Sequence, residues 1–246
     1  MTKSQRCIWE GEVIAMLSIL KLESGYGESM ILRGIDLQVE PGQVVCLIGR
    51  NGVGKTTLMK TIIGLIKPKR GQISYNEQDI TSAPSDRRAK AGIGYVPQGR
   101  DIFPQLTVEQ NLLLGLEAGS TRKRTVPDSV YEIFPVLREM MHRKGGDLSG
   151  GQQQQLSIAR ALVAEPKLLL LDEPMEGIQP SIVMEIEHVI ETIKANRRMS
   201  VLLVEQSLAF ATSIADYYYV MDKGVIVSEG SSLHLSEEQL KKHLAV

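Results

Sequence analysis

The residues best placed for chemistry form a glycine-rich string early in the chain. Gly49-Arg50-Asn51-Gly52-Val53-Gly54-Lys55-Thr56-Thr57 follows the apolar run Val44–Ile48 and precedes a helical pattern, which is the context of a phosphate-binding loop. Glycines let backbone N–H groups surround phosphate oxygens, and the start of a helix adds its positive dipole end. We therefore predict that this loop binds a nucleoside triphosphate, with Lys55 on the β- and γ-phosphates and the Thr56 hydroxyl on Mg²⁺.

A second chemical segment is an apolar run that ends in two carboxylates. Leu168 to Leu171 is followed by Asp172 and Glu173. Asp172 at the end of a buried strand suits the coordination shell of Mg²⁺, and Glu173, on the other face, suits polarisation of an attacking water. Apolar strands that end in an acidic turn are also common without such a role, so this segment does not decide the chemistry by itself.

The string Leu148-Ser149-Gly150-Gly151-Gln152 predicts a second anion site. Two glycines and a hydroxyl stand where a helix over residues 152–164 begins, so bare N–H groups point at one place. One nucleotide has no evident use for two such sites far apart in sequence. Two chains facing head to tail would explain both, with each nucleotide lying between one phosphate loop and the partner's Ser149 helix.

These residues need a scaffold that holds strand ends together, and the apolar pattern predicts one. Alternating segments at 17–20 and 31–39 indicate half-buried strands, and the runs at 44–48, 168–171 and 201–204 indicate buried strands. Helical patterns follow at 58–66, with Leu65 and Ile66 on the buried face, and at 181–195. We predict an α/β fold with a mainly parallel core sheet, an antiparallel N-terminal β part and a helical subdomain inserted at about 99–164.

The length and composition fit one large domain or two small ones. The 246 residues are 43% hydrophobic and 23% charged, a normal globular composition. A net charge of -1 argues against nucleic acid as a partner, and two cysteines are too few for a disulfide framework. No apolar run reaches the ~18 residues that a membrane helix needs. We expect an extension over residues 1–15, a disordered tail or the product of an upstream start site, and a single domain over residues 16–246.

From residue 17 to about 230 the chain resembles the ABC ATPase family, because the phosphate loop, the Ser149 string and the acidic strand occur in that family's order. The resemblance implies the P-loop NTPase core of the ABC type, ATP and Mg²⁺ as cofactors, and hydrolysis of ATP. It also implies that Tyr26 stacks on adenine and that Gln98 contacts Mg²⁺ and water. An ordinary loop tyrosine and a polar strand end are the alternatives for these two residues.

Two positions depart from the commonest family pattern. Gln206 follows the strand at 201–204 where most members have a switch histidine, and Gln179 stands where an aspartate is usual. A glutamine amide can donate a hydrogen bond to a γ-phosphate oxygen, but it cannot titrate near neutral pH. We predict a catalytic role for Gln206 beside Glu173; the alternative is a side chain that faces solvent.

The resemblance also implies partners. They are transmembrane permease subunits, a second ATP-binding subunit (a paralogue or a second copy) and, only indirectly, a periplasmic solute-binding protein, which places the chain on the cytoplasmic face of the membrane. Phe103, Pro104 and Leu106 are expected to line the groove for the permease, or else to pack within the helical insertion. The strings at 99–104, 145–155 and 176–182 look most like the urea-transporter branch, and branched-chain amino-acid uptake is the alternative.

Two other classes of protein share parts of this sequence pattern. A soluble ATPase of this family that acts on DNA or ribosomes usually carries coiled-coil insertions or tandem cassettes, and this sequence has neither. A regulatory module that binds nucleotide without turnover would suit the missing switch histidine, but the retained Glu173 argues against it. Turnover measured with and without membrane subunits separates the three classes.

Overall fold

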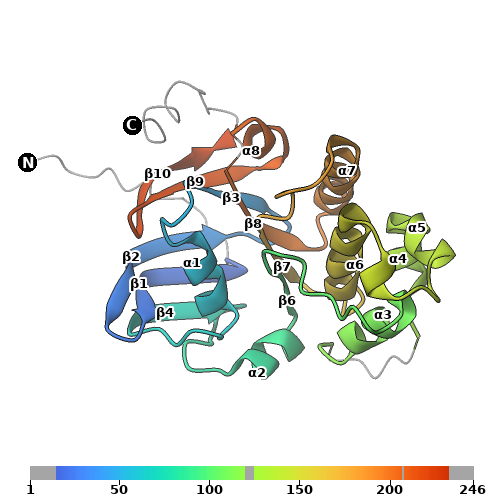
Figure 1. Cartoon of the computed structure of the whole chain (residues 1–246). Coiled ribbons are helices and arrows are strands. Elements are labelled where there is room, and N and C mark those ends of the chain that lie inside the picture. Colours follow the sequence, from blue (N-terminus) through green and yellow to red (C-terminus); the bar gives the residue numbers. More distant parts are fainter. Residues whose placement is uncertain (1–14, 120–124, 207, 233–246) are drawn as a thin grey trace, which may run out of the picture.

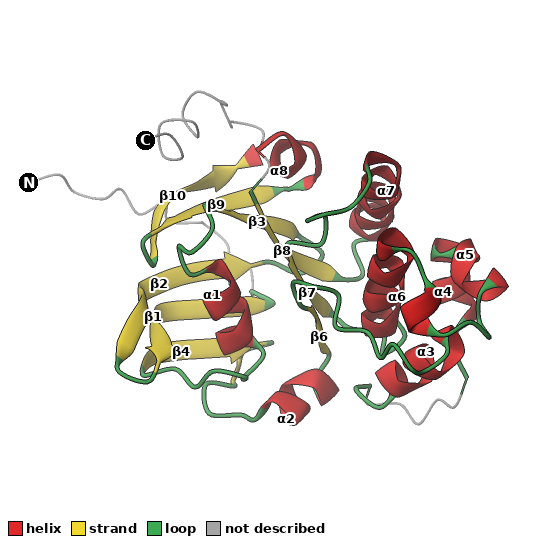
Figure 2. Ribbon diagram, viewed as in Figure 1, coloured by secondary structure: helices red, strands yellow, loops and turns green. Residues whose placement is uncertain are grey.

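A computed structural model describes residues 15–119, 125–206 and 208–232 of the chain. The extension expected over residues 1–15 lies almost wholly outside these described residues. Two β-sheets and a group of helices make up the described part, with the helices α3 to α7 gathered beyond one face of the larger sheet (Figure 1). Figure 2 shows the two sheets and the helices around them.

The smaller sheet is antiparallel, as the alternating N-terminal pattern predicted. Its strand order is β2-β1-β4-β5. The strands are β1 (Leu17–Tyr26), β2 (Ser29–Val39), β4 (Arg70–Tyr75) and β5 (Gln78–Asp79). β1 and β2 form a hairpin that brings Tyr26 opposite Ser29 at its turn.

The larger sheet carries the chemistry at the ends of its strands. Its order is β10-β9-β3-β8-β7-β6, parallel from β9 to β6 and antiparallel between β9 and β10. The strands are β3 (Val44–Ile48), β6 (Ile93–Val96), β7 (Leu168–Asp172), β8 (Ser200–Glu205), β9 (Tyr217–Asp222) and β10 (Val225–Ser231). Because β3, β7 and β8 are neighbours and parallel, the residues that follow them meet at one edge of the sheet.

The helices fall on two sides of this sheet. They are α1 (Lys55–Ile62), α2 (Ser85–Lys90), α3 (Val108–Leu116), α4 (Asp128–Ile133), α5 (Pro135–Glu139), α6 (Gly150–Leu162), α7 (Pro180–Asn196) and α8 (Leu208–Ile214), with a 3₁₀ turn η1 (Gly145–Asp147) before α6. From α3 to α6 the chain is helical except for its loops. That this helical region is a subdomain inserted into the α/β core stays a proposal.

Alternate residues of each central strand supply two hydrophobic cores. Leu169 and Leu171 of β7 pack with α6 and α7, whereas Leu168 and Leu170 pack with α1 and the antiparallel sheet. A strand that is buried on both faces reads as a continuous apolar run, which explains the four consecutive leucines. The core therefore fixes β7 from both sides and sets the position of the carboxylates at its end.

The helix predicted at 58–66 is shorter in the structure. α1 ends at Ile62, and Gly64 turns the chain with a φ of 84°. The prediction that Leu65 lies on a buried face is wrong, because 60% of this residue is exposed. A left-handed glycine ends a helix readily. The apolar residues after Gly64 therefore lie outside the helix, although their spacing is that of a helix.

Candidate functional site

The glycine-rich string forms a loop between β3 and α1, as predicted. Gly52 and Gly54 have φ values of 81° and 114°, and Gly54 is the N-cap of α1. Glycine takes this conformation without the steric penalty of a side chain. No other part of the described structure comes within 4 Å of the place where a Cβ on Gly52 would lie. The loop thus presents backbone N–H groups to open space at the positive end of a helix.

A cavity of about 320 Å³ lies over this loop. Its lining combines parts of the loop with side chains from distant segments: Tyr26, Ile31, Asn51, Gly52, Gly54, Lys55, Thr56, Thr57, Gln98 and Glu173. Tyr26 lies at the edge of this cavity and is 52% exposed, so its aromatic ring can stack on a flat base. The structure therefore brings together Tyr26, Gln98 and Glu173 with the phosphate loop, although they are separated by up to 147 residues in sequence.

Three predicted residues of the loop contribute differently. Val53 points its side chain into the core below the antiparallel sheet, Arg50 is exposed, and neither lines the cavity. Gly49 is closely packed, since a Cβ there would approach the carbonyl oxygen of Met221 to 2.6 Å. Gly49 and Val53 can therefore offer only their backbone to a ligand in the cavity, while the exposed side chain of Arg50 lies outside the lining of the cavity.

Lys55 is the most buried cation of the site. Its Nζ donates to the carbonyl oxygens of Gly49 and Arg50 at 2.8 and 2.9 Å and pairs with Glu173 Oε1 at 3.0 Å. An ammonium group has three donors, so all of them are engaged. A phosphate that binds Lys55 must replace at least one of these partners.

Glu173 is the point where four elements meet. Its backbone is left-handed, with a φ of 49°, a strained conformation for a residue with a side chain. Besides the Lys55 ion pair, its Oε2 accepts hydrogen bonds from the side-chain amides of Gln98 at 3.3 Å and Gln206 at 3.1 Å. Gln98 and Gln206, two predicted site residues, thus donate hydrogen bonds to Glu173, the predicted base.

Asp172 lies beside Thr56 at the end of β7. The Thr56 hydroxyl donates to Asp172 Oδ1 at 3.2 Å, and the Tyr95 hydroxyl approaches Oδ2 at 3.4 Å. Burial raises the pKa of Asp172 to about 6, against the hydrogen bond from Thr56, which lowers it. A hydroxyl and a carboxylate in contact are oxygen ligands that suit Mg²⁺, which keeps most of its other positions for water and phosphate. The residues present therefore fit this ion, and among the described residues no group of three or more His, Cys, Asp or Glu offers a different metal site.

The Ser149 string lies apart from the cavity. Ser149 is the N-cap of α6, where its Oγ accepts from the N–H of Gln152 at 3.3 Å and the Gln152 side chain accepts from the N–H of Ser149 at 2.9 Å. None of Ser149, Gly150, Gly151 and Gln152 lines the cavity over the phosphate loop. Gln152 is occupied as half of a capping box, while the Ser149 hydroxyl keeps a proton that it can donate.

Sequence reasoning missed three residues that contact this machinery. Glu205 is buried at the end of β8, and Tyr95 reaches Asp172 from β6. Arg100 lies against the start of α6, because a Cβ on Gly150 would meet its guanidinium at 2.8 Å. A usable signal existed for Glu205: an acidic residue ends the apolar run at 201–204 just as Asp172 ends the run at 168–171.

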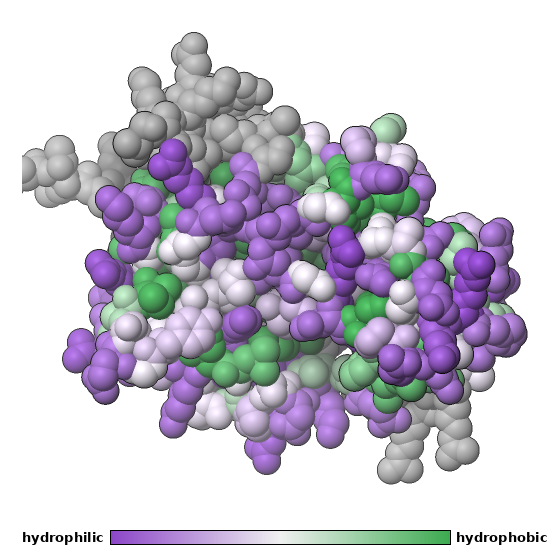
Figure 3. Space-filling model, viewed as in Figure 1, coloured by the Kyte–Doolittle hydropathy of each residue, from purple (hydrophilic) through white to green (hydrophobic). Residues whose placement is uncertain are grey.

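A larger groove of about 680 Å³ runs between α2, β6, α3 and α6. Leu65, Phe103 and Leu114 are exposed apolar side chains on its wall, and the guanidinium of Arg160 stacks on the Phe103 ring at 5.2 Å. Of the three residues expected to line a groove, Phe103 does, and Pro104 and Leu106 do not. Figure 3 shows a mostly hydrophilic face with a hydrophobic patch in its lower centre, in the region where Figure 1 draws α2 and β6.

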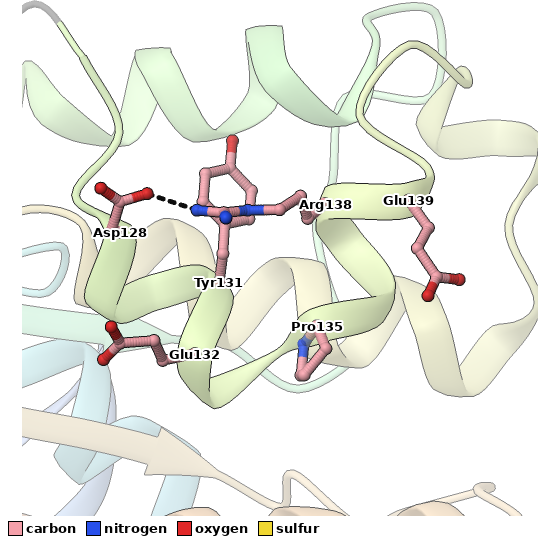
Figure 4. Close-up of a pocket in the computed structure, with 6 residues that line it drawn as sticks. All are labelled: Asp128, Tyr131, Glu132, Pro135, Arg138 and Glu139. Carbon is pink, nitrogen blue, oxygen red and sulfur yellow. Dashed lines mark hydrogen bonds and ion pairs between the residues drawn. The ribbon is translucent and has the colours of Figure 1, made fainter.

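A hollow on α4 and α5 has a different character. It is lined by Asp128, Tyr131, Glu132, Pro135, Arg138 and Glu139 (Figure 4). Arg138 pairs with Asp128 and lies over the Tyr131 ring, 4.8 Å from its centre. Glu132 and Glu139 line the hollow apart from this pair, and the hollow contains none of the predicted site residues.

Comparison with known proteins gives one family and consistent relatives. The family model described as "ABC transporter" matches residues 32–176. The high-affinity branched-chain amino acid transport ATP-binding protein BraG of Pseudomonas aeruginosa is 40% identical over 86% of this chain and 91% of its own length. A probable branched-chain amino acid transport ATP-binding protein, LivF of Archaeoglobus fulgidus, is 37% identical over 91% and 95%. The lipopolysaccharide export system ATP-binding protein LptB of Acidithiobacillus ferridurans is 33% identical over 93% and 95%.

Solved structures agree with the fold. The ADP conformation of an ATP-binding cassette of an ABC transporter superposes with a TM-score of 0.74 at 29% identity, covering 94% of this chain and 95% of the other. A nucleotide-free cassette gives a TM-score of 0.76 at 29% identity, covering 93% and 94%. Within the described part of the chain, no helix has the length and apolar character needed to cross a membrane.

Proposed function

The chain belongs to the ABC transporter family as an ATP-binding, ATP-hydrolysing subunit, and from this premise we propose how its residues divide the work. ATP lies in the cavity of about 320 Å³ over the phosphate loop. Its adenine stacks on Tyr26, and its phosphates lie against the loop from Gly49 to Thr57. Lys55 exchanges a present partner for phosphate oxygens.

The observation that carries this proposal is the set of contacts on Glu173. A buried carboxylate at the mouth of a phosphate loop, held by two amide side chains and a lysine, is placed to accept a proton from water near the γ-phosphate. When a phosphate draws Lys55 away, Glu173 keeps the two amides as orienting partners. Gln98 and Gln206 then hold the base and position water beside it.

We assign Mg²⁺ to Thr56 and Asp172, with Gln98 nearby. When bound, this ion would neutralise charge on the β- and γ-phosphates. The chain's own contribution is to fix two oxygen ligands at 3.2 Å from each other before the ion arrives. The raised pKa of Asp172, about 6, reflects a carboxylate that is buried without a full cation partner, which a divalent ion would supply.

The Ser149 helix serves the nucleotide of a second ATP-binding subunit. This string is outside the chain's own cavity, and the Ser149 hydroxyl, which accepts from the N–H of Gln152, keeps a proton that it can donate. A head-to-tail pair, of two copies or of a paralogue with this chain, places it on the opposite nucleotide. Ser149→Arg should therefore leave nucleotide binding by the isolated chain intact and block hydrolysis in the pair.

The groove between α2, β6, α3 and α6 is the surface that we assign to a permease subunit. Its apolar wall and the Arg160–Phe103 stack suit a short amphipathic helix. Gln98 follows β6, which forms part of the groove, and also touches Glu173. This arrangement gives a partner in the groove a short route to the base, and we propose that the chain lies at the cytoplasmic face of the membrane by binding that partner.

The identity of the transported solute is the most specific part of the proposal. The strings at 99–104, 145–155 and 176–182 favour urea or short amides, and the names of two relatives favour branched-chain amino acids. Solute selection would lie in the permeases and, indirectly, in a periplasmic solute-binding protein.

One experiment tests the whole proposal. The chain is co-purified with its permeases, reconstituted in vesicles and assayed for ATP hydrolysis with the solute-binding protein loaded with urea or with leucine. We expect hydrolysis that urea-loaded binding protein stimulates. If only the leucine-loaded binding protein stimulates hydrolysis, the proposed solute is a branched-chain amino acid and not urea. An assembled complex that binds ATP without turnover would overturn the assignment of an ATPase.

A further inference from the structure

Glu176 is a carboxylate beside the site that the proposed function has not used. Its Oε2 accepts a hydrogen bond from Gln98 Nε2 at 2.7 Å, which is shorter than the 3.3 Å at which the same nitrogen donates to Glu173 Oε2. Gln98 and Glu173 line the cavity over the phosphate loop, and Glu176 does not. Glu176 can therefore act on a ligand in the cavity through the Gln98 side chain or through its charge.

The positions of these side chains follow from the backbone of two neighbouring loops. β6 and β7 are parallel, with Val96 opposite Leu171. Gln98 and Glu173 each lie two residues beyond this pair, so they leave the sheet at the same level. The chain then turns back, because the N–H of Glu176 donates to the Glu173 carbonyl oxygen at 3.2 Å, with proline at the second position of the turn. The glutamine amide is thus held by the carboxylates at the two ends of one tight turn.

The loop that carries Gln98 has a backbone that is fixed by other contacts. Arg100 and Asp101 have φ values of 77° and 46°, a conformation that is uncommon for residues with a side chain. The Arg100 carbonyl oxygen accepts from the Ser157 hydroxyl, and the Asp101 carbonyl oxygen accepts from Arg160 Nη2 at 2.6 Å. Since both donors belong to α6, this helix holds the loop, and the orientation of the Gln98 amide is set by the amide's own hydrogen bonds.

These hydrogen bonds decide which end of the Gln98 amide is available to a ligand. A side-chain amide carries two donor hydrogens on its nitrogen and an acceptor oxygen at its other end. The hydrogen bonds that the described residues give this amide are both made by Nε2, to two carboxylates, which leaves Oε1 for the cavity. If the amide were turned over, its oxygen would face two negatively charged groups. A carbonyl oxygen suits Mg²⁺, whereas the hydrogens of an amide nitrogen do not.

We propose that Glu176 is a positioning residue for Mg²⁺, which holds the nitrogen end of the Gln98 amide so that its oxygen end is presented to the ion. This inference rests on the proposed function, in which Mg²⁺ lies beside the phosphate loop with Gln98 nearby. Glu173 also accepts from Gln206 and, in that function, accepts a proton from water. Glu176 has neither task and lies outside the cavity, so it keeps its contact with Gln98 when a nucleotide enters.

The test is the Mg²⁺ factor, which is the ratio of the affinity for a non-hydrolysable ATP analogue in Mg²⁺ to the affinity in EDTA. It is measured on the whole chain by equilibrium binding. Glu176→Gln keeps the shape but can accept from Gln98 or donate to it, so the orientation of the Gln98 amide is no longer fixed. We expect the Mg²⁺ factor to fall about three- to fivefold, the scale of one exposed contact of a charged group, and the affinity in EDTA to stay within about twofold. Both side chains are exposed, so the variant should fold.

A double variant separates the orientation of the amide from the charge of Glu176. A negative charge near the site would attract Mg²⁺ without any help from Gln98. In a Gln98→Ala background, Glu176→Gln should change the Mg²⁺ factor by less than about 1.5-fold, because no amide remains to be oriented. The matched control is Glu191→Gln, the same change at an exposed position of α7 that pairs with His188 at 3.8 Å. It should leave the Mg²⁺ factor at the wild-type value.

Two results would overturn the inference. One is an unchanged Mg²⁺ factor in Glu176→Gln, including an equal loss of affinity with and without Mg²⁺, which is what a merely structural role predicts. The other is an equal fall in the Mg²⁺ factor with and without Gln98, which is what attraction by charge alone predicts. The proposed function fails in a different way: if Mg²⁺ did not raise the affinity of wild type, the assignment of the ion to this site would be wrong before any variant is compared.

Discussion

In the ligand-free chain Lys55, Gln98 and Gln206 all contact Glu173, and ATP must rearrange these contacts when it binds. Lys55 is tied to Glu173 at 3.0 Å and to two loop carbonyls, while Gln98 also donates to Glu176 at 2.7 Å. A base that is paired with a lysine cannot serve water freely. We infer that phosphate binding does two things at once, because Lys55 gains a stronger anion and Glu173 loses its cation.

Gln206 is the residue whose role is most particular to this sequence. Gln206→Ala removes the hydrogen bond from Nε2 to Glu173 and should lower kcat about tenfold while ATP affinity changes less than about twofold, because the lost contact bears on the base and not on the phosphate loop. Steady-state kinetics and equilibrium nucleotide binding check this split. Turnover equal to wild type would show that the contact does not matter for hydrolysis.

At the scale of single residues, the sequence predicted which residues form the site better than it predicted which of them contact one another. The motif spacing predicted one site with Lys55, Thr56, Asp172 and Glu173, and in the structure Lys55 contacts Glu173 and Thr56 contacts Asp172. It predicted Gln206 as a donor to phosphate, whereas in the structure its amide lies on Glu173, since that depends on how β7 and β8 pair. The acidic end of the run at 201–204 marked Glu205 in the sequence, but its burial could not be predicted, because a glutamate after an apolar strand is exposed or buried according to what packs above it.

Among the elements, α1 carries the site and depends on a buried arginine for its end. Arg88 of α2 is 1% exposed and donates to the carbonyl oxygens of Thr61 and Ile62 at 2.9 and 2.7 Å. It also donates to the carbonyl oxygens of Ala83 and Thr81. A cation at the C-terminus of a helix is favourable, and here it fills the acceptors that the last turn leaves open.

Arg88→Ala should therefore lower the free energy of unfolding by about 2–4 kcal/mol, because the carbonyl groups of Ile62, Thr81 and Ala83 lose the donor that Arg88 supplies. Denaturant unfolding followed by circular dichroism measures this change. Arg87→Ala, an exposed neighbour on the same helix, should cost less than about 0.5 kcal/mol. Equal effects of the two variants would contradict the role of Arg88 as the end cap of α1.

The order and type of the elements could be read from the sequence, but their ends could not. The alternation in the first strands and the continuous apolar runs at 44–48 and 168–171 report burial on one face or two. The end of α1 at Ile62 follows from Gly64 and from Arg88, which comes from a helix 26 residues further along. Periodicity holds no information about such tertiary caps.

For the molecule as a whole, the ligand-free fold should be less stable in mild alkali than in mild acid. The folded pKa of Glu205 is raised to about 7 from an ordinary value of 4.5. A raised carboxyl pKa means that the folded state holds the proton more tightly, so the stability from this group is full below pH 4.5 and is lost as pH rises through 7. The melting temperature of the ligand-free protein should thus fall between pH 5 and pH 8.

Glu205→Gln should make that fall smaller, and Glu28→Gln, at an exposed position, should leave it unchanged. Differential scanning fluorimetry at a series of pH values without nucleotide gives the comparison. The same slope in wild type and in Glu205→Gln would mean that Glu205 does not titrate in this range in the folded chain.

The central claim, that this chain hydrolyses ATP with Glu173 as the base, is tested most directly by turnover of Mg-ATP in the assembled transporter carrying Glu173→Gln. Glutamine keeps the shape and can hold water, but it is a far weaker base, so kcat should fall by about 10²–10⁴-fold. Nucleotide recovered from the variant should be ATP, since the phosphate loop is intact. Turnover at the wild-type rate would contradict the account.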